Sequence, residues 1–134
     1  MIYILDTNVI SAVRRPDRAP QVAAWLQGKA EQDLYLSVVT LGEIERGIRQ
    51  QERKNPVFAA DLRAWMDRTL HLFADRLLPF GPQEAVIWGR LTHDLGHAGA
   101  DLMIAATALA RGAVVVTGNV DDFQPTGAMV ENPF

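Results

Sequence analysis

The sequence predicts an α/β fold: a three-layer α/β/α sandwich around a four- or five-stranded, mainly parallel sheet. Two observations lead to this class. Short, almost wholly apolar runs such as Met1–Leu5 and Ala113–Thr117 are typical of strands buried on both faces. Segments with helical spacing separate these runs, and this alternation indicates a parallel sheet covered by helices. The 134 residues suit a single domain, 1–134, with one core.

The predicted strands share three properties: they are short, apolar, and followed by a turn or a polar residue. We expect them at Met1–Leu5, Leu34–Leu36, Leu77–Phe80 and Ala113–Thr117, with a short edge strand at Met129–Val130.

Capping residues and prolines mark the helices of the N-terminal third. Thr7 and Asn8 can cap a short helix over Val9–Arg14. Pro20 suits the first turn of a second helix, over Gln21–Ala30.

Two longer helices follow. Thr40-Leu-Gly-Glu43 matches a capping box, which predicts a helix from Thr40 to about Glu52 or Arg53. Pro56 opens an amphipathic helix whose apolar residues recur at roughly helical spacing.

The last two helices end at glycines. Pro82 starts a helix to about Leu95, followed by Gly96. The segment Ala100–Arg111 predicts a helix that Gly112 terminates.

Composition narrows the function classes. The chain has no cysteine, which excludes a disulfide scaffold, a thiolate zinc site and a cysteine nucleophile. The formal net charge of −3 is unlike that of a protein that grips nucleic acid by charge alone. The longest apolar stretch, Leu102–Val116, is interrupted and too short for a membrane span. Met1–Leu5 is too short for a signal peptide, so we expect a cytoplasmic protein without membrane contact.

Acidic residues recur at the ends of the predicted buried elements. Asp6 follows the first strand, Glu43 comes soon after the second, and Asp101 opens an apolar helix. The last strand leads into Thr117-Gly-Asn-Val-Asp-Asp-Phe123. Ligands of parallel α/β sheets bind beyond the carboxyl ends of the strands, so one crevice should collect these acids. Buried carboxylates need compensation, and a hard cation such as Mg²⁺ or Mn²⁺ provides it.

Each acid also has an ordinary structural interpretation. Asp6 suits a helix cap, although Thr7 and Asn8 could cap that helix and leave Asp6 free. Glu43 can complete the capping box instead of binding a metal. A carboxylate such as Asp101 is favoured near a helix N-terminus by the helix dipole. The segment 117–123 has the composition of an ordinary turn.

Other reactive constellations are absent. His93 and His97 do not form a familiar zinc spacing and are interpreted as surface or cap residues. Ser11 and Ser37 have no evident triad, and the glycines form no phosphate-binding loop.

Taken together, four segments resemble the PIN domain family, in particular VapC- and FitB-type toxins of bacterial type II toxin–antitoxin pairs. The segments are Ile4-Leu-Asp6-Thr-Asn-Val-Ile-Ser11, Leu36-Ser-Val-Val-Thr-Leu-Gly-Glu43-Ile-Glu-Arg-Gly47, Ala100-Asp101-Leu-Met-Ile-Ala-Ala-Thr-Ala108 and Val116-Thr-Gly-Asn119-Val-Asp-Asp-Phe123. The resemblance covers essentially the whole chain. It implies a Mg²⁺- or Mn²⁺-dependent ribonuclease and a small antitoxin that blocks its cleft.

The resemblance assigns roles to the acids. Asp6, Glu43 and Asp101 would hold one metal ion, directly or through its waters. Asp122, with Asn119, would position a second metal ion or the attacking water. Many relatives carry aspartate where this chain has Asn119.

Three further residues are expected to support this site. Thr7 or Asn8 would orient Asp6 by hydrogen bonding, and Thr117 would support the same group of residues.

Arginines near the predicted site are candidates for RNA contact. Arg14 and Arg15 come soon after Asp6, and Arg46 begins a second basic stretch. The alternative for each is a solvated helix face.

The resemblance and the three tryptophans also predict partners. Trp25, Trp65 and Trp88 are expected to contribute to packing or to a homodimer interface, because aromatic residues are enriched at interfaces. Promoter DNA would be bound only through the antitoxin.

Two rival functions stay open at this point. The first is a catalytically weak PIN domain that acts as a binding module in an antitoxin–promoter repression complex, suggested by Asn119. The second is a phosphatase or phosphoacceptor domain, suggested by Asp6 after the first strand. The absence of an aspartate two residues after Asp6 argues against the phosphatase.

Overall fold

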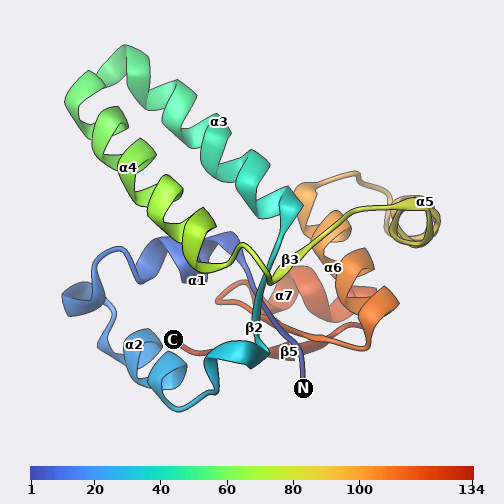
Figure 1. Cartoon of the computed structure of the whole chain (residues 1–134). Helices are drawn as coiled ribbons and strands as arrows, with labels where there is room; N and C mark the ends of the chain where they lie inside the picture. The colour runs from blue at the N-terminus through green and yellow to red at the C-terminus, as the bar shows by residue number, and fades with distance from the viewer.

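A computed structural model describes residues 1–134 and contains a five-stranded, all-parallel sheet in the order β3-β2-β1-β4-β5 (Figure 1). The strands are β1 (Tyr3–Leu5), β2 (Leu34–Ser37), β3 (Leu77–Leu78), β4 (Val114–Val116) and β5 (Met129–Glu131). The predicted fold class is therefore confirmed, including the edge strand.

Seven helices connect and cover the strands. They are α1 (Thr7–Ala12), α2 (Pro20–Gln27), α3 (Val38–Lys54), α4 (Pro56–Leu72), α5 (Pro82–Leu95), α6 (Ala100–Arg111) and α7 (Val120–Phe123). Helices α3 and α4 pack side by side as a hairpin that projects away from the sheet (Figure 1). None of the helices is both long and apolar enough to cross a membrane.

The strands bury both of their faces, as their apolar sequences predicted. Leu5 and Val116 pack into a cluster with residues of α1, α3 and α4. Their strand neighbours Ile4 and Val115 point the other way, into a second cluster with Phe123 and residues of α6. This alternation places helices on both faces and produces the three layers.

The start of α3 differs from the predicted capping box. Ser37 is the N-cap, and its hydroxyl accepts a hydrogen bond from the backbone N–H of Val39 at 3.1 Å. Thr40 is fully buried within the first turn. The side chain of Glu43 accepts a hydrogen bond from the hydroxyl of Thr7 instead of capping the helix. The predicted box is wrong because a serine three residues earlier already caps the helix.

A buried arginine joins α4 to the sheet. The Arg76 side chain donates hydrogen bonds to the backbone carbonyls of Leu34 at 2.9 Å and Leu72 at 2.8 Å, and to that of Glu31. Only 7% of Arg76 is exposed. It thereby satisfies carbonyls at the end of α4 and at the start of β2.

We expect Arg76→Met to lower the free energy of unfolding by about 3 kcal/mol, because buried carbonyls lose their charged donor. Urea denaturation measures this. The control is Asp75→Ala at a side chain that is 85% exposed, where a change within about 0.5 kcal/mol is expected. Equal stability of Arg76→Met and wild type would show that these contacts contribute little.

Candidate active site

Asp6 lies at the carboxyl end of the central strand, beside the point where the strand order reverses. Strands β2 and β3 continue to one side of β1, and β4 and β5 to the other. The backbone N–H of Asp6 donates to the carbonyl of Val116 at 2.9 Å, which ties it to β4. Only 3% of Asp6 is exposed. This is where ligand sites of open parallel sheets form.

Both carboxylate oxygens of Asp6 are held in place. Oδ1 accepts a hydrogen bond from the backbone N–H of Thr7 at 2.8 Å, and Oδ2 accepts one from the hydroxyl of Thr117 at 2.8 Å. Asp6 itself is therefore the N-cap of α1, and the expectation that Thr7 or Asn8 caps this helix is wrong. A capping aspartate still has lone pairs for another ligand.

Thr7 connects the first strand end to α3. Its hydroxyl donates to Oε1 of Glu43 at 2.6 Å. The side chain of Thr7 thus orients Glu43, while its backbone N–H binds Asp6. Glu43 faces the carboxyl edge of the sheet and does not cap α3.

Two further acids lie near Asp6. Asp101 is in the first turn of α6, and Asp122 is in α7. Burial is the main cause that raises the pKa of Asp6, and the negative charges of Glu43 and Asp122 add to the effect, against hydrogen bonds from Thr117 and Thr7. The four predicted acids therefore act on one another across long sequence separations.

The pKa of Asp101 is also raised. Burial is again the largest cause, followed by the negative charges of Asp6 and Asp122. His97, in the turn before α6, opposes this shift. Its Nδ1 accepts a hydrogen bond from the backbone N–H of Gly99 at 3.3 Å. His97 was interpreted as a surface or cap residue, and it is indeed exposed, with its ring bound to the backbone of the glycine turn.

The loop after β4 is organised around Thr117. Its hydroxyl oxygen accepts a hydrogen bond from the backbone N–H of Asn119 at 2.9 Å and one from the Asn8 side chain at 3.4 Å, besides donating to Asp6. Asn8 also accepts a hydrogen bond from Gly118 N–H at 3.4 Å. Thr117 is fully buried and lies next to Asp6, where the sequence analysis expected a supporting residue.

Asn119 lies on the rim of the site. It is exposed and lines a hollow of about 320 Å³ with Asp121, Asp122 and Asn132. Its backbone precedes α7, a short helix within the segment interpreted as a turn. Asp122, and not Asp121, is the acid whose charge acts on Asp6 and Asp101.

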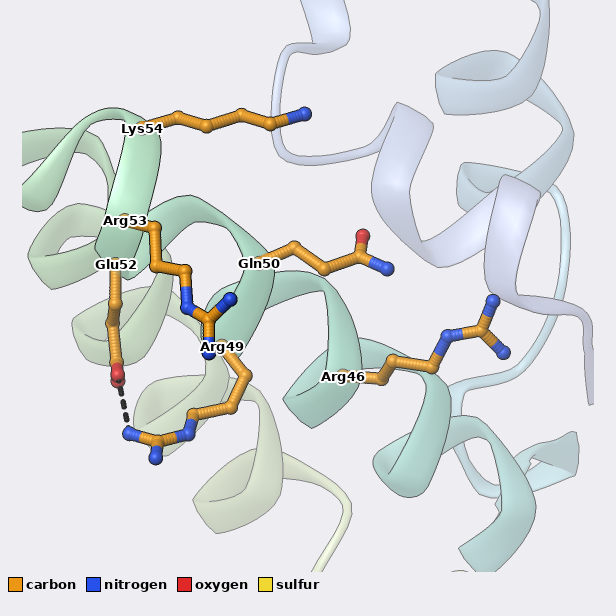
Figure 2. Close-up of a pocket in the computed structure, with 6 residues that line it drawn as sticks. All are labelled: Arg46, Arg49, Gln50, Glu52, Arg53 and Lys54. Atoms are coloured by element: carbon orange, nitrogen blue, oxygen red, sulfur yellow. Dashed lines mark hydrogen bonds and ion pairs between the residues drawn. The ribbon is translucent and has the colours of Figure 1, made fainter.

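The candidate RNA-contacting arginines lie outside the group of acids. Arg14 is half-buried, with its guanidinium carbon 5.1 Å from the ring centroid of Phe58 on α4. Arg15 is exposed. Arg46 is exposed on α3 and points away from the helix surface (Figure 2).

The chemistry of these residues fits a hard divalent cation. Oxygen ligands dominate, and the charges of three carboxylates oppose one another. No three Asp, Glu, His or Cys side chains are placed to hold one ion directly by themselves. Mg²⁺ keeps several waters and requires only one or two carboxylates, so the arrangement suits a hydrated ion.

We expect the stability of metal-free protein to depend on pH through Asp101. Because its pKa is raised in the folded state, the stability that it contributes is present at about pH 4 and lost as pH rises toward 7. Asp101→Asn lacks this ionisation, so its stability relative to wild type should increase over the same range.

Urea denaturation with EDTA at both pH values measures this difference. Asp61→Asn, at an exposed position of α4, is the matched control. A difference between wild type and Asp101→Asn that is constant with pH would contradict the electrostatic account.

A sequence model described as "PIN domain" matches residues 3–127. The chain belongs to the PIN domain family. The match spans β1 and every acid of the site. The resemblance on which the sequence analysis relied is thus confirmed.

Two relatives and one solved structure are similar to this chain over nearly its full length. Toxin FitB of Neisseria gonorrhoeae is 36% identical over 140 residues, covering 99% of both chains. VapC ribonuclease Y4jK of Sinorhizobium fredii is 33% identical, covering 99% of this chain and 98% of that protein. The structure of FitAB bound to an IR36 DNA fragment superposes with a TM-score of 0.84 at 34% identity, covering 98% and 95% of the two chains.

Proposed function

We propose that this PIN domain is a Mg²⁺- or Mn²⁺-dependent endoribonuclease and the toxin of a type II toxin–antitoxin pair. One observation carries the proposal: Asp6, Asp101 and Asp122 come together at the carboxyl edge of the sheet, where burial and mutual repulsion raise the pKa values of Asp6 and Asp101. Similarity to proteins named toxin FitB and VapC ribonuclease supports the same activity.

Asp6, Glu43 and Asp101 would hold the metal ion, directly or through water. When bound, Mg²⁺ or Mn²⁺ supplies positive charge for the phosphodiester and acidifies water for attack on phosphorus. Thr117 and the N–H of Thr7 fix the orientation of Asp6 before substrate arrives. The hydroxyl of Thr7 does the same for Glu43. Such preset side chains reduce the reorganisation that the reaction requires.

Asp122 would serve the attacking side of the reaction. Its negative charge helps to raise the pKa of both Asp6 and Asp101, which supports a role in positioning a second ion or in accepting a hydrogen bond from the attacking water. Asn119, on the rim beside it, would provide an uncharged amide for the same group.

The antitoxin would cover this site. An apolar groove of about 270 Å³ lies between α1, α2 and α4, lined by eight hydrophobic residues that include Leu26, Trp65 and Leu72. This shape favours a hydrophobic helix, with a basic side chain reaching the acids. Promoter DNA would be bound through that antitoxin; the similar FitAB complex has been solved with a bound IR36 DNA fragment.

We also propose a cytoplasmic protein, one catalytic domain over residues 1–134, and a homodimer. Two of the three tryptophans predicted at a dimer interface pack against aromatic residues of the same chain. Trp25 packs edge-on against Tyr3 at 5.4 Å between ring centroids. Trp88 packs against Phe80 at 6.5 Å, and its buried Nε1 has no hydrogen-bond partner within the chain.

A catalytically weak binding module is the second candidate. Asn119 motivates it, because an amide lacks the negative charge that a divalent ion favours. The deciding experiment incubates the protein with a panel of structured and single-stranded RNAs in Mg²⁺, in Mn²⁺ and in EDTA. Metal-dependent cleavage that Glu43→Gln removes supports the enzyme. Absence of cleavage at every metal concentration, together with intact antitoxin and promoter binding, would replace it by the binding module.

A further inference from the structure

A hollow of about 220 Å³ opens beside Glu43, between α1, α3 and α4. Thr7 and Glu43 of the proposed active site form one wall. Gln50, Gln51 and Phe58 line other parts of it, and none of these three has a role in the site described above. The hollow is therefore continuous with the acids but chemically different from them.

The lining combines flat apolar side chains with side-chain amides that have no hydrogen-bond partner within the protein. Phe58, Leu62 and Trp65 provide the apolar part. Gln50 and Gln51 make no side-chain hydrogen bonds within the protein, although neighbouring side chains do. RNA-binding proteins recognise splayed bases by stacking on aromatic rings and by hydrogen bonds to base edges. A glutamine amide offers the paired donor and acceptor that a base edge requires.

The size of the hollow suits one ring system. Pockets for drug-sized ligands have volumes of roughly 300–1,000 Å³, and this hollow is smaller. Gly47 helps to keep it open: it lines the hollow, and a Cβ built at this position would meet no atom within 4 Å. Glycine weakens the middle of a helix, so its presence in α3 suits a need for space.

Positive charge extends from this hollow along α3. Three cations lie on the same side of the helix as Glu43, because they follow it at helical spacings of 3, 10 and 11 residues: Arg46, Arg53 and Lys54. Gln50, seven residues after Glu43, lies on this side too. Figure 2 shows that Arg46, Gln50 and Lys54 extend to one side of α3. Arg49 is instead paired with Glu52 at 2.7 Å.

Arg14 adds a cation next to the hollow, through its contact with the lining residue Phe58. Its guanidinium lies over the ring of Phe58, at the edge of the hollow. A guanidinium plane is itself a stacking surface for bases. The positive charges of Arg14 and Arg46, near this hollow, attract a polyanion.

We propose that this hollow binds one unstacked base of the RNA next to the scissile phosphate, and that Arg46, Arg53 and Lys54 bind the phosphates that follow. This inference deepens the proposed ribonuclease function and rests on it for the position of the scissile bond. Base contacts in the hollow would then set part of the sequence preference, while the contacts of α3 would position the strand.

The test fills the hollow without removing any ligand. Gly47→Leu is expected to raise or maintain the unfolding midpoint, because leucine favours helix over glycine. Its affinity for fluorescein-labelled single-stranded RNA in EDTA, measured by anisotropy, should fall roughly 10- to 100-fold, the value of one stacked base. Gly89→Leu, at an exposed and open glycine of α5, is the matched control and should bind as wild type.

The proposed phosphate contacts of α3 are tested separately, by the salt dependence of RNA affinity. The double variant Arg46→Gln, Arg53→Gln should lower the slope of log affinity against log salt by about 1.4, or about 0.7 for each contact to a single strand. Arg68→Gln with Arg90→Gln, at exposed positions of α4 and α5, is the control of equal charge. An equal loss of slope in both double variants would overturn the role of α3.

The base site and the ribonuclease function are contradicted by different results. If Gly47→Leu binds RNA as tightly as the wild-type protein, or cleaves it as fast, the base site is overturned. This conclusion does not depend on whether the wild-type protein is a nuclease. The same follows if Gly47→Leu loses only antitoxin binding, or if wild type binds no RNA at low salt. Weakened RNA binding by Gly47→Leu, together with a wild type that cleaves nothing in Mn²⁺, would support the base site and overturn the ribonuclease function.

Discussion

Asp6→Asn is expected to lower the rate of RNA cleavage by about 10²- to 10⁴-fold while the protein stays folded. The substitution removes one negative charge from the centre of the acid group. Asparagine is as good an N-cap as aspartate, so the backbone N–H of Thr7 keeps its acceptor and α1 keeps its start. Loss of repulsion with Glu43 and Asp122 also favours the metal-free fold.

Initial cleavage rates in Mn²⁺, with near-ultraviolet circular dichroism of the same samples, measure this outcome. Asp121→Asn is the control, because Asp121 is exposed in the same short helix, α7, as Asp122 but does not act on Asp6. A folded Asp6→Asn that cleaves at the wild-type rate would remove Asp6 from the catalytic group. An unfolded variant would show instead that the fold requires the carboxylate, whose Oδ2 accepts the hydrogen bond from Thr117.

Asp122→Asn is expected to lower activity by about 10- to 100-fold, less than the loss of Asp6, since Asp122 acts from the exposed side of the group. Asn119→Asp should keep activity and strengthen metal binding, because added ligand charge favours a divalent ion. A Mn²⁺ titration of the cleavage rate compares both variants with wild type.

The same titration decides between the two candidate functions. An inert wild type beside an active Asn119→Asp would identify a degraded nuclease, and the binding module would replace the enzyme. A loss of activity in Asn119→Asp would show that the amide itself, and not a missing charge, is required at this position.

Helix ends that depend on a proline or glycine at the end itself were predicted correctly from the sequence. Helix α5 begins at Pro82, and α6 ends where Gly112 adopts φ 61°, both at the predicted residues. The buried strands were predicted because both faces are apolar. The start of α3 was missed, since the Thr40-to-Glu43 pattern is local whereas Glu43 binds Thr7, 36 residues away.

The acids of the candidate site were named from the sequence, and their roles stay a prediction; the contacts that they make were not predicted. The topology of parallel strands predicted that Asp6 and the segment after the fourth strand share one edge, whereas the choice of Asp122 within that segment followed from the family resemblance. The double role of Asp6 as cap and candidate ligand, and the short helix α7, depend on backbone geometry that turn-forming residues do not specify. Buried Arg76 and Glu84 were missed because charged residues look exposed until their tertiary partners are known.

The central claim is that Asp6 and Asp101 bind a divalent ion, and direct Mn²⁺ binding tests it most closely. The measurement is the decrease of the free Mn²⁺ electron paramagnetic resonance signal as metal-free protein is added. The account predicts saturable binding by wild type and by Asp121→Asn, and at least about tenfold weaker binding by Asp6→Asn and by Asp101→Asn. Equal Mn²⁺ affinity in all four proteins would contradict it.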